Sequence, residues 1–243
     1  NFDLKATLKT LVFDNLTANN IDLIASINHE SISIDQLNAG ILGGSMLFKG
    51  AINNLSAVPT FKGSLNIRAL PLHNIFSLLK KEIPLRGDLN LNGDFSTKGL
   101  ENALIMRHLS GNIRANISNG ELIGVNYPEL ACEGFSLLKR DSFKHNNAPK
   151  STRFKTLSGN ATIQNGIIHN NNLKIEIQGL SANGAGSINL NKETLDYRIN
   201  LKSQDSGIPN CKIDQYLKNI AIPLRCQGSF VNTGSTLCGI DQD

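Results

Sequence analysis

The sequence contains no tryptophan, few other aromatic residues and few charges, and each shortage argues against a class of protein. Of its 243 residues, 5% are aromatic and 18% are charged, whereas about a quarter are charged in an average soluble protein. Solvated helices usually carry many charges, so a mainly helical protein is disfavoured. The hydrophobic share of 40% is sufficient for a folded core, which excludes an intrinsically disordered chain.

Basic clusters, long apolar runs and catalytic motifs are also missing. The net charge of +4 is spread along the chain without neighbouring aromatic residues, which argues against nucleic-acid binding. The apolar runs are much shorter than the roughly 20 residues of a membrane-spanning helix. The five His share no metal-ligand spacing with one another or with Cys. We therefore expect no metal, no cofactor and no enzymatic activity.

The feature that dominates the sequence is the alternation of apolar and polar residues. Leu89 and Leu91 alternate with Asn90 and Asn92, and the same pattern returns in most of the chain. A period of two places all the apolar residues of a strand on one face of a sheet. Gly residues and Asn-Gly pairs predict hairpin turns, for example at Asn92-Gly93, Asn119-Gly120, Asn165-Gly166 and Asn183-Gly184. The sequence thus predicts a long antiparallel meander with one apolar face.

A few segments depart from this period. Apolar residues at helical spacing predict amphipathic helices over about 71–81 and 127–140, and a third, short helix over 213–219. The polar stretch 141–152 is expected to be a loop. Three short helices are too few to cover one face of so large a sheet, so an apolar concavity is expected to remain.

The predicted fold is mainly β: a long, curved antiparallel meander of repeated hairpins that forms an open apolar groove shaped like a taco, with two or three short helices. We expect one elongated domain over 1–243, with an upstream β-repeat over 1–100 and a C-terminal repeat over 101–243 that ends in the Cys-containing segment. The residues predicted to face the groove are Leu65, Ile67, Leu89, Leu91, Phe95, Ile113, Ile117, Ile163, Ile175, Ile177, Ile188, Leu190, Tyr197 and Ile199.

The four Cys match no zinc-binding spacing, and in an oxidising compartment disulfides are the simplest interpretation. A bridge from Cys211 to Cys226 would close a short loop and is preferred, which leaves Cys132 and Cys238 as a second pair. Four Cys permit three different pairings, and buried free thiols are an alternative.

An ordered series of strand and turn motifs resembles a known family. The series consists of residues 85–99, 109–113, 118–126, Thr152-Arg153-Phe154, Leu157-Ser158-Gly159, 184–190, 195–198 and 222–225. In this order it is similar to the C-terminal region of the AsmA family, within an AsmA/TamB-like superfamily of inter-membrane lipid bridges. The segment from Leu37 to Gly44 resembles the preceding repeat of the same family.

The resemblance implies a periplasmic protein of outer-membrane biogenesis, tethered to the bacterial inner membrane. The chain begins at Asn1 without a signal-like region, so the membrane contact is expected in segments missing from this sequence. The implied partner is a phospholipid or another acyl lipid, held or conducted between the two membranes. Protein partners in the periplasm or at the outer membrane are not identified by the resemblance.

Two other functions fit the same strand pattern. A sheet folded over on itself would give an ordinary core, and the domain would then be a non-catalytic scaffold or docking module for outer-membrane protein assembly. A polysaccharide-binding β-solenoid is the third hypothesis, suggested by the many Asn and Gly. It is disfavoured because the chain has three Tyr, no Trp and no strand rich in acidic residues.

Overall fold

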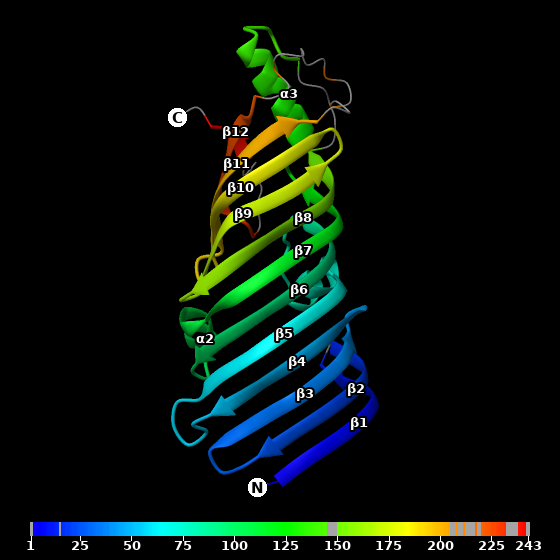
Figure 1. Ribbon diagram of the computed structural model, residues 1–243, viewed down its shortest axis with the longest axis vertical. Helices are drawn as coiled ribbons and strands as arrows, with labels where there is room; N and C mark the ends of the chain where they lie inside the picture. The colour runs from blue at the N-terminus through cyan, green and yellow to red at the C-terminus, as the bar shows by residue number, and fades with distance from the viewer. Residues whose placement is uncertain are drawn as a thin grey trace.

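The computed structural model describes residues 2–14, 16–144, 150–204, 208, 211, 217, 220–231 and 238–241. These form a 13-stranded antiparallel sheet in which each strand pairs with the next along the chain (Figure 1). The strands are β1 (Phe2–Phe13), β2 (Leu16–Ile27), β3 (Ser31–Ile41), β4 (Gly44–Asn53), β5 (Thr60–Pro71), β6 (Leu85–Lys98), β7 (Ser110–Ile123), β8 (Ser151–Gln164), β9 (Ile167–Ile177), β10 (Leu180–Asn189), β11 (Thr194–Ser203), β12 (Ile222–Ser229) and β13 (Cys238–Ile240). The predicted β-meander is confirmed.

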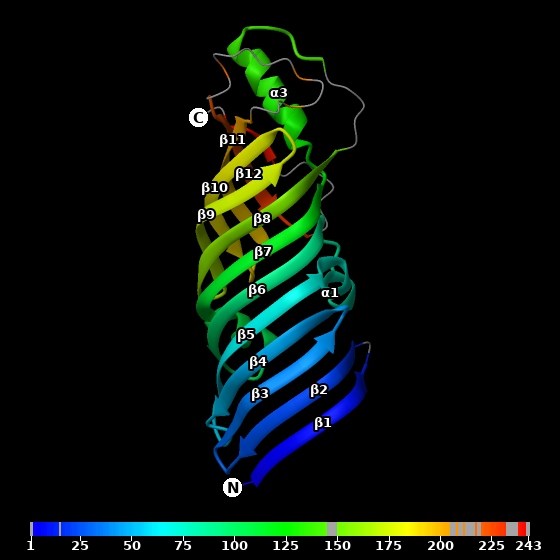
Figure 2. The same cartoon turned by 45° about the vertical axis from the view of Figure 1, so that its right-hand side comes forward.

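The molecule is elongated, with the strands stacked along its long axis. Figures 1 and 2 show β1 at one end and helix α3 (Tyr127–Leu138) at the other, with the sheet curved between them. Among the described residues, no helix has both the length and the hydropathy needed to cross a membrane.

The connections between strands alternate between the two long edges of the sheet, as a meander requires. Helix α1 (Leu72–Leu78) joins β5 to β6 at one edge, and helix α2 (Asn102–His108) joins β6 to β7 at the other. We call these the α1 edge and the α2 edge. Helix α3 joins β7 to β8 and therefore begins at the α1 edge, whereas the turn between β10 and β11 lies at the α2 edge.

The helices predicted over 71–81 and 127–140 are present as α1 and α3, somewhat shorter than expected. Helix α3 begins with a capped turn, because the Asn126 side chain accepts a hydrogen bond from the Glu129 N–H at 3.1 Å. Helix α2 was not predicted, since it is a single exposed element of seven residues without a buried face. The third predicted helix, over 213–219, lies almost entirely outside the described residues, as does the centre of the predicted loop over 141–152.

Three of the four predicted Asn-Gly turns are wrong. Only Asn165-Gly166 turns a hairpin, between β8 and β9, whereas the other pairs lie inside β6, β7 and β10. In these strands the glycine leaves room for a neighbour. A Cβ on Gly93 would lie 2.8 Å from Cγ2 of Ile113, and one on Gly120 would overlap the ring of Phe154. Glycine marks both turns and close packing, and the sequence does not distinguish the two.

The hydrophobic core lies toward the C-terminal end of the sheet. Its buried residues run from Leu72 in α1 to Cys238 in β13 and include none from β1 to β4. Leu180, Leu201 and Leu224 are fully buried there, under α3 and its surroundings. Gly134 of α3 approaches Ile222 of β12 so closely that a Cβ would lie 2.5 Å from the Ile222 Cγ2 atom. The helix thus packs directly on the last strands.

Candidate functional site

One face of the sheet is apolar across successive strands, and we call it the trough. Side chains that lie directly opposite one another in neighbouring strands share a face, so the strand register traces it. One row of such partners runs across five strands and consists of Phe48, Leu65, Gly93, Ile113 and Ala161. A second row contains Ile67, Leu91, Ala115 and Gly159. The alternation in the sequence therefore produces one continuous surface.

The residues predicted to face the groove all lie on this face except Leu190. The register pairs Leu89 with Ile117, and Ile163 with Ile168, across neighbouring strands. Leu190 lies in the turn after β10, because that strand ends at Asn189. The strand register therefore does not place Leu190 on either face, because its alternation with Ile188 continues past the end of the strand.

The burial of the trough residues increases toward the C-terminal strands. The half-buried ones are Leu65, Ile67, Leu89, Leu91, Phe95, Ile113, Ile188 and Tyr197. The buried ones are Ile117, Ile163, Ile175, Ile177 and Ile199. The trough is thus open along its first strands and covered farther on.

The covered part of the trough contains an apolar cavity of about 290 Å³, which we call the end cavity. Its walls come from both edges of the sheet, from the strands between them and from the residues that precede and begin α3. The lining consists of Pro84, Leu85, Ile117, Leu122, Ile123, Gly124, Val125, Tyr127, Leu157, Leu173, Ile175, Ile188, Leu195, Tyr197, Ile199, Cys226 and Cys238. The only polar side-chain groups of this lining are the two tyrosine hydroxyls, so the cavity favours an apolar occupant.

The two edges of the sheet are joined by an ion pair near this cavity. Lys81 follows α1 at the α1 edge, and Glu193 ends the turn between β10 and β11 at the α2 edge. The Lys81 Nζ and the Glu193 Oε1 are 2.6 Å apart, and each side chain is about 40% exposed. Because the residues belong to opposite edges, the sheet must curve until its edges meet across the trough. No sequence signal indicates a pair separated by 112 residues.

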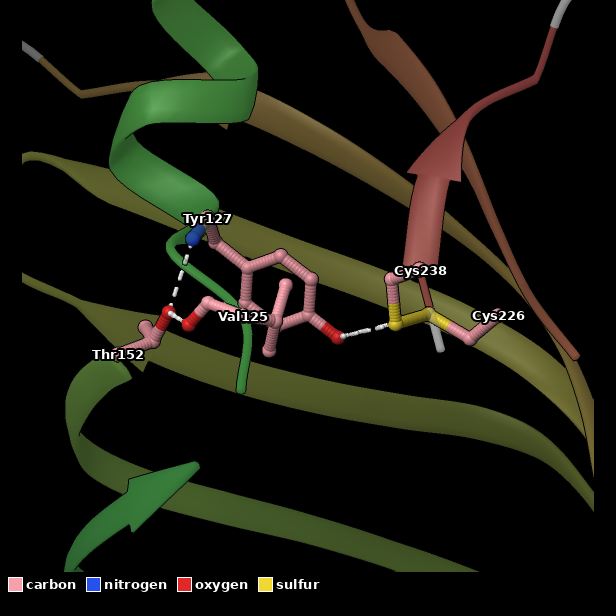
Figure 3. The surroundings of a disulfide bond; sticks show 5 residues. All are labelled: Val125, Tyr127, Thr152, Cys226 and Cys238. Carbon is pink, nitrogen blue, oxygen red and sulfur yellow. Dashed lines mark hydrogen bonds between the residues drawn. A yellow bond between two sulfur atoms is a disulfide. The ribbon is translucent and has the colours of Figure 1, made fainter. Parts of the chain in front are cut away.

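Tyr127, the first residue of α3, belongs to the lining of the end cavity, and Figure 3 shows its surroundings. Its hydroxyl lies 3.5 Å from the Cys238 Sγ and 3.6 Å from the Cys226 Sγ, and its backbone N–H donates to the Thr152 Oγ1 at 2.8 Å. The Thr152 hydroxyl in turn donates to the carbonyl of Val125 at 2.7 Å. Burial raises the pKa of the Tyr127 hydroxyl well above its usual range, and a smaller burial effect raises the pKa of Tyr197.

The disulfides differ from the predicted pairing. Cys132 of α3 bonds Cys211, and Cys226 bonds Cys238, so the preferred Cys211–Cys226 bridge was wrong. Cys226 and Cys238 lie directly opposite each other in β12 and β13, with their Cα atoms 4.0 Å apart. The three-residue strand β13 is too short to be recognised from its sequence, and without it this pairing could not be foreseen.

Titratable groups gather into no further site in the described part of the chain. There, no group of three or more His, Cys, Asp or Glu side chains is placed to hold a metal ion.

One buried polar side chain on the trough face has an atom without a hydrogen-bond partner. Asn170 is 8% exposed and its Nδ2 donates to the Asn160 carbonyl at 2.7 Å, whereas its Oδ1 has no partner. This hydrogen bond lies at an irregularity in the pairing of β8 with β9, where it satisfies the backbone carbonyl of Asn160.

The fold and the trough define a class of protein: an elongated β-meander with one apolar face, covered at one end. Comparison with known families matches residues 1–173 to the AsmA family, and the chain belongs to this family. It is 21% identical to Protein AsmA of Escherichia coli over 199 residues, which are 82% of this chain and 32% of that protein. It is 26% identical to an uncharacterised protein of Haemophilus influenzae over 180 residues, which are 73% of this chain and 40% of that protein.

The resemblance inferred from the sequence is thereby confirmed. The chain spans less than half the length of either of these relatives. No solved structure matches it.

Proposed function

We propose that this chain is part of a non-catalytic periplasmic protein of outer-membrane biogenesis, tethered to the inner membrane by segments outside it. In this proposal the trough holds or conducts the acyl chains of phospholipids between the inner and outer membranes. The observation on which the proposal depends is the continuous apolar face, which stays partly exposed along Leu65, Ile67 and Leu91 and leads to the end cavity. An apolar surface of this kind usually marks an interaction site.

The compartment is supported by the cysteines and by the family. All four Cys form disulfides, which persist in oxidising compartments such as the bacterial periplasm. The AsmA relative reported above is a bacterial protein. Placement in the periplasm can be tested by fractionation of the full-length protein, with the free thiols counted by alkylation before and after reduction. Alkylation of all four Cys without a reductant would contradict it.

The end cavity favours lipid binding over the scaffold alternative. A sheet that simply folded over on itself would fill its interior with its own side chains, at the packing density of protein cores. Here a cavity of about 290 Å³ remains between the walls. A polysaccharide ligand would instead need polar and aromatic side chains, and the cavity lining has few of either.

The test is mass spectrometry of lipid that copurifies with the protein, expressed in the periplasm with its disulfides formed. We expect acyl lipid in a fixed ratio to the protein, and a lower ratio for Leu91→Arg, which places a charge on the open part of the trough. The matched control is Asn92→Arg, which adds the same charge to the exposed opposite face of β6. A wild-type protein consistently free of lipid would contradict the proposal.

A further inference from the structure

The end cavity has the size of part of a lipid rather than of a whole one. If a methylene group occupies about as much space as a water molecule, roughly 30 Å³, then a cavity of 290 Å³ holds about ten carbons. This is one acyl chain or its terminal portion. A phospholipid with two chains and a headgroup does not fit within this volume.

The chemistry of the walls determines which end of the lipid enters. At the closed end, the Tyr127 hydroxyl points at the Cys226–Cys238 disulfide rather than into open space (Figure 3). A charged or hydrated headgroup would find no adequate hydrogen-bonding partner among this lining and would lose its water without compensation. The methyl end of an acyl chain makes no hydrogen bonds with water, so it enters the cavity without this cost.

The route to the cavity passes the point where the edges of the sheet meet. A depression beside α1 is lined by His73, Phe76, Lys81 and Arg86, among others, and it shares Pro84, Leu85 and Ile123 with the end cavity. Lys81 thus lies on the rim next to the cavity, and its ion pair with Glu193 connects the edges there. A partly exposed ion pair of this kind is weak, so it can open without unfolding the sheet.

We propose that the end cavity binds a single acyl chain, methyl end first, and that the Lys81–Glu193 ion pair is a latch beside its entrance. This inference rests on the proposed function, and it adds an end point to the trough. A chain that slides along the open strands would come to rest with its terminal carbons among Ile175, Ile199 and Leu173. The headgroup would then stay outside, toward the α1 edge.

The first experiment fills the cavity. Leu173→Trp enlarges a half-buried residue of the cavity lining, which lies opposite Gly184 in β10. The matched control is Lys174→Trp, next to Leu173 in β9 but exposed and outside the cavity lining. The readout is displacement of a fluorescent fatty acid by unlabelled fatty acids. We expect Leu173→Trp to lose about tenfold or more in affinity, because roughly two methylenes are displaced at about fourfold each. Lys174→Trp should change the affinity by about twofold at most.

The second measurement uses the wild-type protein and a series of fatty acids. Affinity should rise about fourfold per added methylene until the cavity is filled at about ten carbons, and rise less steeply beyond. This series keeps the proposal testable if Leu173→Trp does not fold. In that case Ile188→Phe, a smaller enlargement of another lining residue, replaces it.

The latch is tested by charge reversal. Lys81→Glu and Glu193→Lys each remove the pair, and the double variant restores it with the charges exchanged. Each single variant should speed association and dissociation of the probe by about two- to fivefold, as expected for an exposed pair. The double variant should return to the wild-type rates. Equal association and dissociation rates in all four proteins would overturn the proposal that this ion pair is a latch.

The outcomes separate this inference from the proposed function. If Leu173→Trp binds like the wild type while Leu91→Arg lowers the lipid ratio, lipid lies in the trough but not in the end cavity, and the inference is overturned alone. If affinity keeps rising equally with every methylene, the cavity is not the end point. If the wild-type protein binds no fatty acid and copurifies with no lipid, the proposed function fails as well.

Discussion

The two halves of the sheet have the same strand pattern but differ in what covers their apolar face. In β1 to β6, apolar trough residues remain exposed, such as Leu8 at 44%. In β7 to β13, Leu201 and Leu224 are completely buried. The difference comes from additions to the second half, namely α3, the two disulfides and the turn that brings Glu193 to Lys81. Alternation sets which face is apolar, and elements outside the strands decide whether it becomes a core.

The strongest test of this contrast is a charge placed on the same face in each half. Ile175 is 2% exposed in β9, so Ile175→Arg would bury an unpaired charge and should lower the free energy of unfolding by about 5 kcal/mol or more. Leu91 is half-buried in β6, and Leu91→Arg should cost about 1 kcal/mol because the guanidinium can reach water. Urea unfolding of both variants measures the difference. Equal losses would show that the first half is covered as well.

The disulfides should stabilise only the second half. The Cys132–Cys211 bond spans 79 residues, and replacing both Cys by Ser should cost about 4 kcal/mol, against about 3 kcal/mol for Cys226–Cys238, which spans 12 residues. Hydrogen exchange followed by mass spectrometry checks where the loss occurs. Faster exchange is expected in β7 to β13 and unchanged exchange in β1 to β4. A uniform increase along the chain would mean that the sheet unfolds as a single unit.

The same contrast explains how far the sequence could predict the structure. The period-two runs identified the meander and almost every trough residue, because alternation depends only on local geometry. They did not indicate that β10 ends before Leu190, because nothing in the sequence marks the end of this strand. The Asn-Gly pairs inside β6, β7 and β10 failed for another reason. Their glycines are required by close contacts with neighbouring strands, which are distant in the sequence.

The site was less predictable than the fold. The closed end depends on contacts between residues far apart in the chain, such as Tyr127 with Cys238 and Lys81 with Glu193. None of these residues belongs to a motif that indicates its partner. The correct disulfide pairing likewise required the short strand β13. The sequence identified an apolar face, and the curvature of the sheet determines where that face is covered.

A smaller difference is expected between two buried threonines, one in each half. The Thr152 hydroxyl satisfies both the Tyr127 N–H and the Val125 carbonyl, whereas the Thr97 hydroxyl donates to the Ile105 carbonyl of α2 at 2.6 Å. Thr152→Val leaves two buried backbone groups without this partner and should cost about 2 kcal/mol, whereas Thr97→Val should cost about 1 kcal/mol. Thermal unfolding of the two isosteric variants measures this. A larger loss for Thr97→Val would contradict the ranking.

The last effect concerns pH and is confined to the second half, because β1 to β6 contain no tyrosine. Burial raises the pKa of the Tyr127 hydroxyl in the folded protein, whereas in the unfolded chain it titrates at about 10. The unfolded state therefore loses this proton first as the pH rises. The contribution of Tyr127 to stability is fully present below about pH 10 and declines above it, by about 1.4 kcal/mol at pH 11.

Tyr127→Phe has no proton to lose, so its unfolding free energy should fall less between pH 8 and pH 11 than that of the wild type. Urea unfolding at both pH values measures the difference, which other titrating groups leave unchanged because both proteins contain them. Parallel losses in the two proteins would show that the hydroxyl is solvated and that α3 does not seal the end cavity.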